Sequence, residues 1–185
     1  MKHVVTMVVL LNFGVAGVYA QRGNVNLSLS GTAAPSPISL QKTPASEYQL
    51  TGNGLLGQFS LRVVSTGTTT PQTSTTCSGA TKVFFASVAG GGVFRSLTGS
   101  LLKLNLTGGG DCIDFAVGEA VCTRVFQIIG GTNRFANASG TLTLTMKVIP
   151  VVADGPTNPV FFAVTADLTG TVSPTVADGL EDDRR

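Results

Sequence analysis

Apolar and polar residues alternate one by one in several stretches of this chain, and this period of two constrains the fold more than any other feature. The clearest example is GTLTLTMKV at 140–148, where every even-numbered position from Leu142 to Val148 is apolar. Successive side chains of a β-strand point to opposite faces of the sheet. The pattern therefore predicts strands with one face in a core and the other in water.

The same alternation recurs along the chain. It is found in NVNLSLSGT (24–32), LLGQFSLRVV (55–64), LTGSLLKLNLT (97–107) and VFFAVTADLTGTVS (160–173), and strands with less regular faces are expected at 82–88, 93–97 and 120–129. Glycine runs at 90–92, 108–110 and 130–131 predict tight turns between antiparallel neighbours. We expect an all-β fold, a single antiparallel barrel of about eight strands, because closure leaves no open edge; a sandwich is the alternative.

The first twenty residues have the parts of a secretory signal. Lys2 supplies the basic start, an apolar run follows around 4–11, and small residues lead to an expected cleavage after Ala20. The run is too short and too interrupted to span a bilayer. We expect a helical signal peptide at 1–20, a β-barrel domain at 21–177 and a charged flexible tail at 178–185. The protein would then be secreted, either outside the cell or into a periplasm.

Charge and composition argue against several classes of partner and chemistry. The chain has 12 Lys and Arg against 10 Asp and Glu, so removal of Lys2 with the signal would leave 11 against 10. Balanced charge predicts no strong attraction for nucleic acid or anionic lipid. The only histidine, His3, lies in the signal, which excludes histidine-dependent catalysis in the mature chain. No integral membrane association is expected, because no later segment has about 18 consecutive apolar residues, and an outer-membrane barrel would need aromatic girdles.

Three cysteines would enter an oxidising compartment, so one disulfide and one remaining thiol are expected. A hairpin centred at Val117 would place Cys112 and Cys122 opposite each other, and we predict that they are bonded. Cys77, in the polar loop TGTTTPQTSTTCSGATK, is the alternative partner.

The segment IIGGTNRFANASGTLTLT (128–145) could hold a phosphate or turn the chain. A phosphate cradle requires backbone N–H groups at the start of a helix. Here another alternating strand follows, so a turn is favoured, with Phe135 closing the end of the core. Arg134 and the turn amides remain the candidate anion site.

The strand at 120–129 admits one polar side chain to the interior whichever face it buries. Cys122, Arg124 and Phe126 share one face, and Gln127 lies on the other. Arg124, Gln127 and Arg134 are therefore the candidates for orienting a ligand, although a structural contact is the alternative role. Tyr48, the only tyrosine after the signal, is expected to pack at the rim rather than to act as an acid or base.

No cofactor or metal is expected. Asp111, Asp114 and Glu119 beside a glycine run resemble one turn of a calcium-binding repeat, but such sites need stacked copies. Surface carboxylates are the simpler interpretation. Sequons at Asn26, Asn105 and Asn137 matter only in a eukaryotic secretory path.

Residues 128–143, IIGGTNRFANASGTLT, resemble a glycine-rich element of the allene oxide cyclase and dirigent barrel superfamily. GNGLLGQF at 52–59 precedes the element and LTGTV at 168–172 follows it. Asn133 and Asn137 stand where glycine is common in that family. The resemblance implies an eight-stranded antiparallel barrel with an apolar interior, but it assigns no catalytic residue here.

Three functions are compatible with these features. The favoured one is a secreted barrel that binds a small apolar ligand without changing it. The alternatives are an isomerase, cyclase or dirigent-like protein that guides a reactive intermediate, and a structural extracellular protein whose interior is filled. An internal void of about 300 Å³ or more would favour a ligand, and a filled interior would favour structure. Self-association is compatible with each of them.

Overall fold

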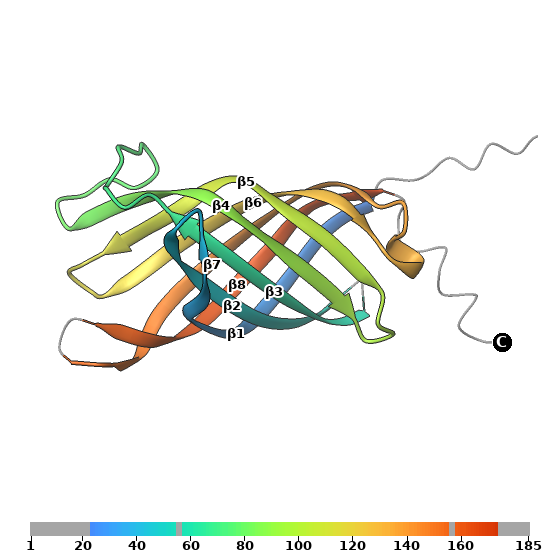
Figure 1. Ribbon diagram of the computed structural model, residues 1–185, viewed down its shortest axis with the longest axis horizontal. Coiled ribbons are helices and arrows are strands. Elements are labelled where there is room, and N and C mark those ends of the chain that lie inside the picture. Colours follow the sequence, from blue (N-terminus) through green and yellow to red (C-terminus); the bar gives the residue numbers. More distant parts are fainter. Residues whose placement is uncertain (1–22, 55–56, 156–157, 174–185) are drawn as a thin grey trace, which may run out of the picture.

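The computed structural model describes residues 23–54, 57–155 and 158–173. Eight antiparallel strands follow one another in chain order around a closed barrel, in which β8 also pairs with β1 (Figure 1). The strands are β1 (Gly23–Leu40), β2 (Thr43–Gly54), β3 (Gly57–Gly67), β4 (Lys82–Ser96), β5 (Leu101–Asp114), β6 (Glu119–Gly131), β7 (Ser139–Ala153) and β8 (Pro159–Ser173). The predicted all-β, eight-stranded antiparallel barrel is confirmed. The expected signal peptide at 1–20 and the tail at 178–185 lie outside the described residues.

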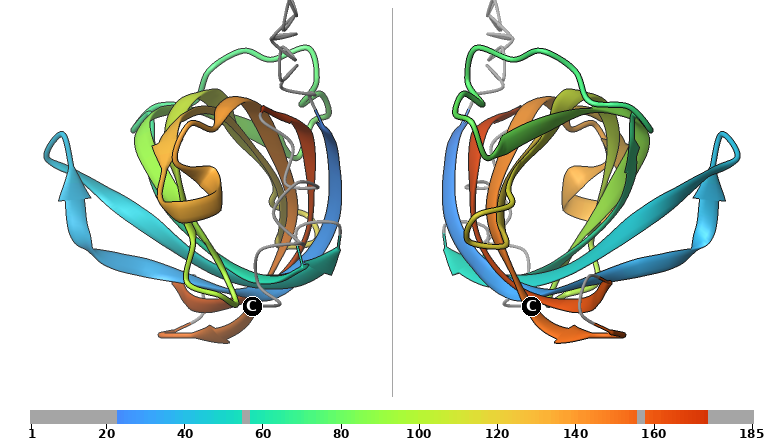
Figure 2. Two further views of the ribbon diagram at one scale, coloured as in Figure 1. Left: turned by 90° about the vertical axis from the view of Figure 1, so that its right-hand side faces the viewer. Right: turned by 90° about the vertical axis from the view of Figure 1, so that its left-hand side faces the viewer.

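The two ends of the barrel differ. The β1–β2, β3–β4, β5–β6 and β7–β8 connections lie toward one end, which we call the loop end because it carries the long loop 68–81 (Figure 1). The opposite end carries a short 3₁₀ helix, η1 (Asn133–Phe135), and we call it the η1 end. At the loop end, the hairpin of β1 and β2 leans away from the barrel (Figure 2). Within the described residues no helix has the length and apolar character needed to cross a membrane.

The period of two correctly identifies which side chains point inward. Leu142, Leu144 and Met146 are fully buried, while Lys147 on the same strand is exposed. The predicted apolar faces around 25–29, 59–63, 102–104 and 164–172 are buried in the same way. Small eight-stranded barrels are just wide enough for side chains to fill them, and this core follows that rule.

Aromatic side chains fill the η1 end. Phe94 stacks on Phe59 with ring centroids 4.5 Å apart and meets the edge of Phe135 at 5.8 Å. Phe135 comes from η1 and is 1% exposed, so it closes this end of the core as predicted. Gly131 permits this packing, because a Cβ there would collide with Phe135 and with the Leu101 carbonyl oxygen.

Two glycine runs do not form the expected turns. Gly90–Gly92 lies inside β4 and Gly108–Gly110 inside β5, so the separate strands expected at 82–88 and 93–97 are one strand. All of these glycines except Gly108 instead allow close approach between neighbouring strands. A Cβ on Gly91 would stand 2.8 Å from the Leu104 carbonyl oxygen, and a Cβ on Gly110 would overlap the Phe84 ring. The third run, at 130–131, does end a strand, and the chain then turns into β7 as expected.

The predicted disulfide is wrong. Cys112 is bonded to Cys77, with Cα atoms 5.5 Å apart, and Cys122 is a buried free thiol. The β5–β6 register pairs Cys112 with Val121 and Cys122 with Asp111, one residue away from the expected alignment. A shift of one residue moves a side chain to the other face of a sheet. Cys112 therefore reaches the 68–81 loop, while Cys122 points into the barrel.

Candidate functional site

A small pocket opens into the barrel at the loop end. Its volume is about 140 Å³, and it is lined by Ala33, Ala34, Ser46, Tyr48, Asp111, Ile113, Ala120, Cys122, Val148 and Phe162. Most of these side chains are apolar, and the polar ones come from β2, β5 and β6. The leaning β1–β2 hairpin supplies one wall and the ends of β5 to β8 supply the rest. The pocket therefore combines apolar walls with a few polar groups.

Arg124 lies at the centre of the polar groups and is 2% exposed. Its Nη1 is 2.7 Å from Asp111 Oδ1. This contact is an ion pair whose geometry does not meet the criteria of a hydrogen bond. Its Nη2 donates to Asp111 Oδ2 at 3.1 Å. The carboxylate contacts the guanidinium at two points, so it fixes the orientation of this buried arginine and also neutralises its charge.

The remaining donors of Arg124 are also used. Nε donates to Ser65 Oγ at 2.9 Å, Nη2 to the Tyr48 hydroxyl at 3.2 Å, and Nη1 to the Thr123 carbonyl at 3.0 Å. The guanidinium carbon lies 5.6 Å from the centre of the Tyr48 ring. Strands β2, β3, β5 and β6 thus meet at one side chain, because the curvature of the barrel brings strands that are not paired with each other face to face.

Cys122 completes this polar cluster. It lines the same pocket as Tyr48 and Asp111, and both of these groups influence the pKa of its thiol. Burial raises the pKa of Cys122, and it also raises the pKa of Tyr48. Burial alone would lower the pKa of Arg124, but the acidic groups Tyr48 and Asp111 raise it overall. At neutral pH the cluster therefore holds a neutral thiol, a neutral phenol and a charge-balanced ion pair.

The three residues predicted to orient a ligand, Arg124, Gln127 and Arg134, lie in different parts of the barrel. Arg124 faces the interior, whereas Gln127 points outward and is exposed. Arg134 lies at the η1 end, where its guanidinium stacks 4.9 Å from the centre of the Phe135 ring. Of the three, the structure therefore places only Arg124 beside the pocket, where it contacts the lining residues Asp111 and Tyr48 without lining the pocket itself. Tyr48 is 4% exposed inside the barrel, so its expected place at the rim is wrong.

The three carboxylates considered for calcium do not converge. Asp111 faces Arg124, Glu119 Oε2 is 2.9 Å from Lys147 Nζ, and Asp114 accepts a hydrogen bond from the Ala116 amide. Among the described residues, no group of three or more acidic, cysteine or histidine side chains is placed to hold a metal ion.

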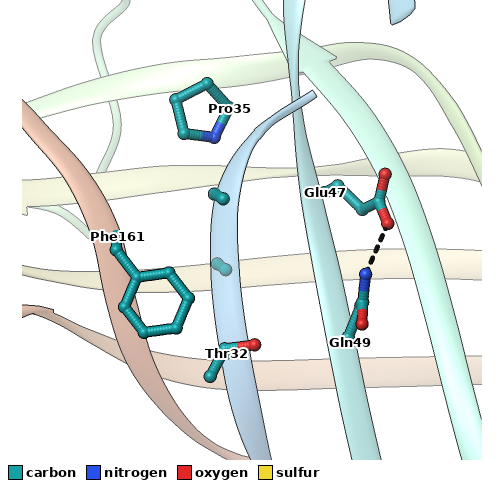
Figure 3. Close-up of a pocket in the computed structure, with 7 residues that line it drawn as sticks. Thr32, Pro35, Glu47, Gln49 and Phe161 are labelled. Carbon is teal, nitrogen blue, oxygen red and sulfur yellow. Dashed lines mark hydrogen bonds between the residues drawn. The ribbon is translucent and has the colours of Figure 1, made fainter. Parts of the chain in front are cut away.

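A second hollow, of about 280 Å³, lies on the face of β2 that carries Glu47 and Gln49 (Figure 3). Thr32, Pro35 and Phe161 line it together with Glu47 and Gln49. The Glu47 carboxylate accepts hydrogen bonds from Arg62 Nε at 2.8 Å, Arg62 Nη2 at 3.0 Å and Gln49 Nε2 at 2.9 Å. These bonds lower the pKa of Glu47, Arg62 having the largest effect. Because the buried acid is already satisfied, it anchors the hairpin rather than awaiting a ligand.

Sequence reasoning missed most of the polar cluster. It singled out Arg124, but it assigned Cys122 to a disulfide and Asp111 to the surface. The signal that could have found them is the parity of β5 and β6: once Arg124 is placed inside, Cys122 must also point inside, because side chains two apart share a face. No protein-family model, no curated protein and no solved structure matches this chain.

Proposed function

We propose that this protein is a secreted barrel that binds a small, neutral molecule in the loop-end pocket, with an apolar body against the walls and one hydrogen-bonding group at the polar cluster. The observation that carries the proposal is the position of the buried Arg124–Asp111 pair beside a pocket with apolar walls. Binding pockets generally combine apolar walls with a few fixed polar groups.

The volume limits the size of the ligand. At about 140 Å³ the pocket does not reach the void of about 300 Å³ named above as favouring a ligand, so it is too small for a drug-sized molecule. An apolar cavity of about 150 Å³ in another protein holds one benzene molecule. The pocket thus suits a single ring or the end of a longer molecule.

The charges favour a neutral ligand with a hydroxyl or N–H group. Arg124 and Asp111 neutralise each other, so a charged ligand would be desolvated without a counter-charge. The Asp111 side chain keeps 23% of its surface exposed, and a carboxylate accepts more hydrogen bonds than the two contacts with Arg124 use. Asp111 could therefore recognise a ligand hydroxyl by accepting a hydrogen bond from it.

Secretion and family kinship belong to the same proposal. The Cys77–Cys112 disulfide is of the kind that persists in oxidising compartments, and this supports export by the expected signal at 1–20. The closed eight-stranded barrel supports kinship with the allene oxide cyclase and dirigent superfamily at the level of architecture.

A second candidate function, that of a structural extracellular barrel, is favoured by the packing of the interior. Phe94, Phe126 and Leu168 have no exposed surface, and the core continues through all eight strands. In that role the loop-end pocket would be only a gap where the β1–β2 hairpin leans away.

Native mass spectrometry of the protein secreted by its own host separates the two functions. The binding proposal predicts an additional mass of one small organic molecule that is released on unfolding. The matched variants are Ala120→Leu, which extends a side chain into the pocket, and Val121→Leu, which extends its neighbour outward. Loss of the additional mass in Ala120→Leu alone supports binding in the pocket. A bare polypeptide mass in every sample favours the structural role.

A further inference from the structure

Large apolar side chains are exposed around the loop end. Of the twelve exposed large hydrophobic residues in the described part of the chain, Ile38 on the β1–β2 hairpin and Val121 near the start of β6 lie toward this end. Six more lie on its β5–β6 and β7–β8 connections: Phe115, Val117, Ile149, Val151, Val152 and Phe161. We call this set the apolar rim. Phe115 and Val117 belong to the β5–β6 turn and are 65% and 64% exposed, while the others belong to the β7–β8 hairpin. Within the described residues, Val93, Leu97 and Ile129 are the exposed large hydrophobic residues toward the η1 end.

The outer faces of β8 and β1 do not share this character. Along β8 and β1 the outward side chains are Thr165, Asp167, Thr169, Asn24, Asn26 and Ser28. An exposed cluster of large apolar residues on an otherwise polar surface marks an interaction site. The apolar rim is therefore a candidate docking surface, and its shape and charge indicate what it contacts.

The shape is a set of separate projections rather than one continuous face. The β5–β6 turn and the β7–β8 hairpin project from the same end of the barrel at different points around its circumference (Figure 2). A rigid protein partner buries one continuous, complementary patch. A fluid lipid surface accepts several separate apolar tips, each entering the boundary between headgroups and acyl chains.

The charges at the loop end match a lipid surface without net charge. Lys42, Lys82 and Lys147 are offset by Asp114, Glu119 and Asp154, and the Lys147–Glu119 pair is 2.9 Å apart. Attraction to anionic lipid requires an excess of basic residues near the membrane. Three cations against three anions provide no such excess.

We propose that the loop end docks peripherally on a phospholipid bilayer of zwitterionic headgroups, with the apolar rim entering the interface. The loop-end pocket opens at the same end, so a docked barrel would present the pocket to molecules dissolved in the lipid. The docking itself does not depend on the proposed ligand binding, because none of the rim residues lines the pocket.

The test is flotation of the secreted chain with phosphatidylcholine vesicles, using wild type and two pairs of substitutions. Phe115→Ser/Val117→Ser and Val151→Ser/Val152→Ser each remove two exposed apolar side chains, from different hairpins. We expect each to lower the partition coefficient at least about tenfold, given the transfer energy of such side chains. Leu97→Ser is the control, since Leu97 is 78% exposed at the η1 end; it should change partitioning less than about twofold. Circular dichroism verifies folding.

Several results would overturn this proposal. These are absence of wild-type binding to phosphatidylcholine, equal loss in Leu97→Ser, or binding that requires anionic lipid and disappears at high salt. Concentration-dependent dimerisation that Phe115→Ser/Val117→Ser abolishes, without vesicle binding, would assign the rim to a second copy of the chain. Ala120→Leu distinguishes this proposal from pocket binding, because it should block the pocket and leave vesicle binding unchanged.

Discussion

The guanidinium of Arg124 holds the carboxylate of Asp111 inside the barrel, with Nη1 and Nη2 2.7 and 3.1 Å from the two carboxylate oxygens. The two partners are not equally enclosed: the side chain of Arg124 is 2% exposed and that of Asp111 is 23% exposed. A charge left without its partner costs more free energy where less water reaches it. The two residues should therefore respond differently to substitution.

Asp111→Ala should lower the free energy of unfolding more than Arg124→Met does. The first change leaves a fully enclosed cation unpaired, at a cost of about 3–5 kcal/mol, and the second leaves a carboxylate that water can partly reach, at a cost of about 2 kcal/mol. Urea denaturation of both variants and of the double variant measures this. The double variant should lose less than the sum of the two, and additive losses would contradict the pairing.

Cys122 should resist alkylation in the folded protein. It is buried, and burial raises its pKa, so little reactive thiolate is present at neutral pH. Peptide mapping after iodoacetamide treatment should show Cys77 linked to Cys112, with Cys122 labelled only in denaturant. Rapid labelling of native protein would contradict its position inside the barrel.

Reduction of the Cys77–Cys112 disulfide should lower the free energy of unfolding by about 4 kcal/mol, because the bond joins residues 35 apart in the sequence.

Protonation of Glu47 should lower the free energy of unfolding of the barrel in acid. Its pKa is lowered in the folded state, mainly by hydrogen bonds from Arg62. The carboxylate therefore stabilises the fold above its unfolded pKa, and this contribution is lost as the pH falls through the lower, folded value. In denaturation curves between about pH 5 and pH 3, Glu47→Gln should flatten the loss of stability, and Arg62→Met should act in the same direction. An unchanged pH profile in both variants would contradict this role.

Much of the fold could be predicted because the residues of each strand alone indicate which of its side chains are buried in a barrel. Leu142 and Leu144 point inward whatever strand lies beside them, since alternation depends only on their own strand. The glycines of β4 and β5 could not be interpreted this way. Glycine serves both turns and close strand contacts, and only the neighbours Leu104 and Phe84 distinguish the two roles.

The candidate site was harder to predict because its residues meet across the barrel. Asp111 and Arg124 lie on neighbouring strands, but Tyr48 and Ser65, on β2 and β3, reach Arg124 only because the sheet curves into a barrel. Strand β2 was not among the predicted alternating segments, because its sequence TPASEYQLTGNG alternates weakly. The cysteine pairing was predicted wrongly because the observed β5–β6 register differs by one residue from the expected one. The residues of the turn do not specify that register.

Calorimetric titration with phenol tests the central claim, that the pocket beside the Arg124–Asp111 pair binds a small neutral molecule. Phenol should bind wild type and Val121→Leu, and toluene, which has the same ring but no hydroxyl, should bind at least about tenfold more weakly, given the strength of a hydrogen bond to a charged group. Ala120→Leu should abolish the heat of binding. Absence of phenol binding to wild type, or equal binding to Ala120→Leu, would contradict the claim.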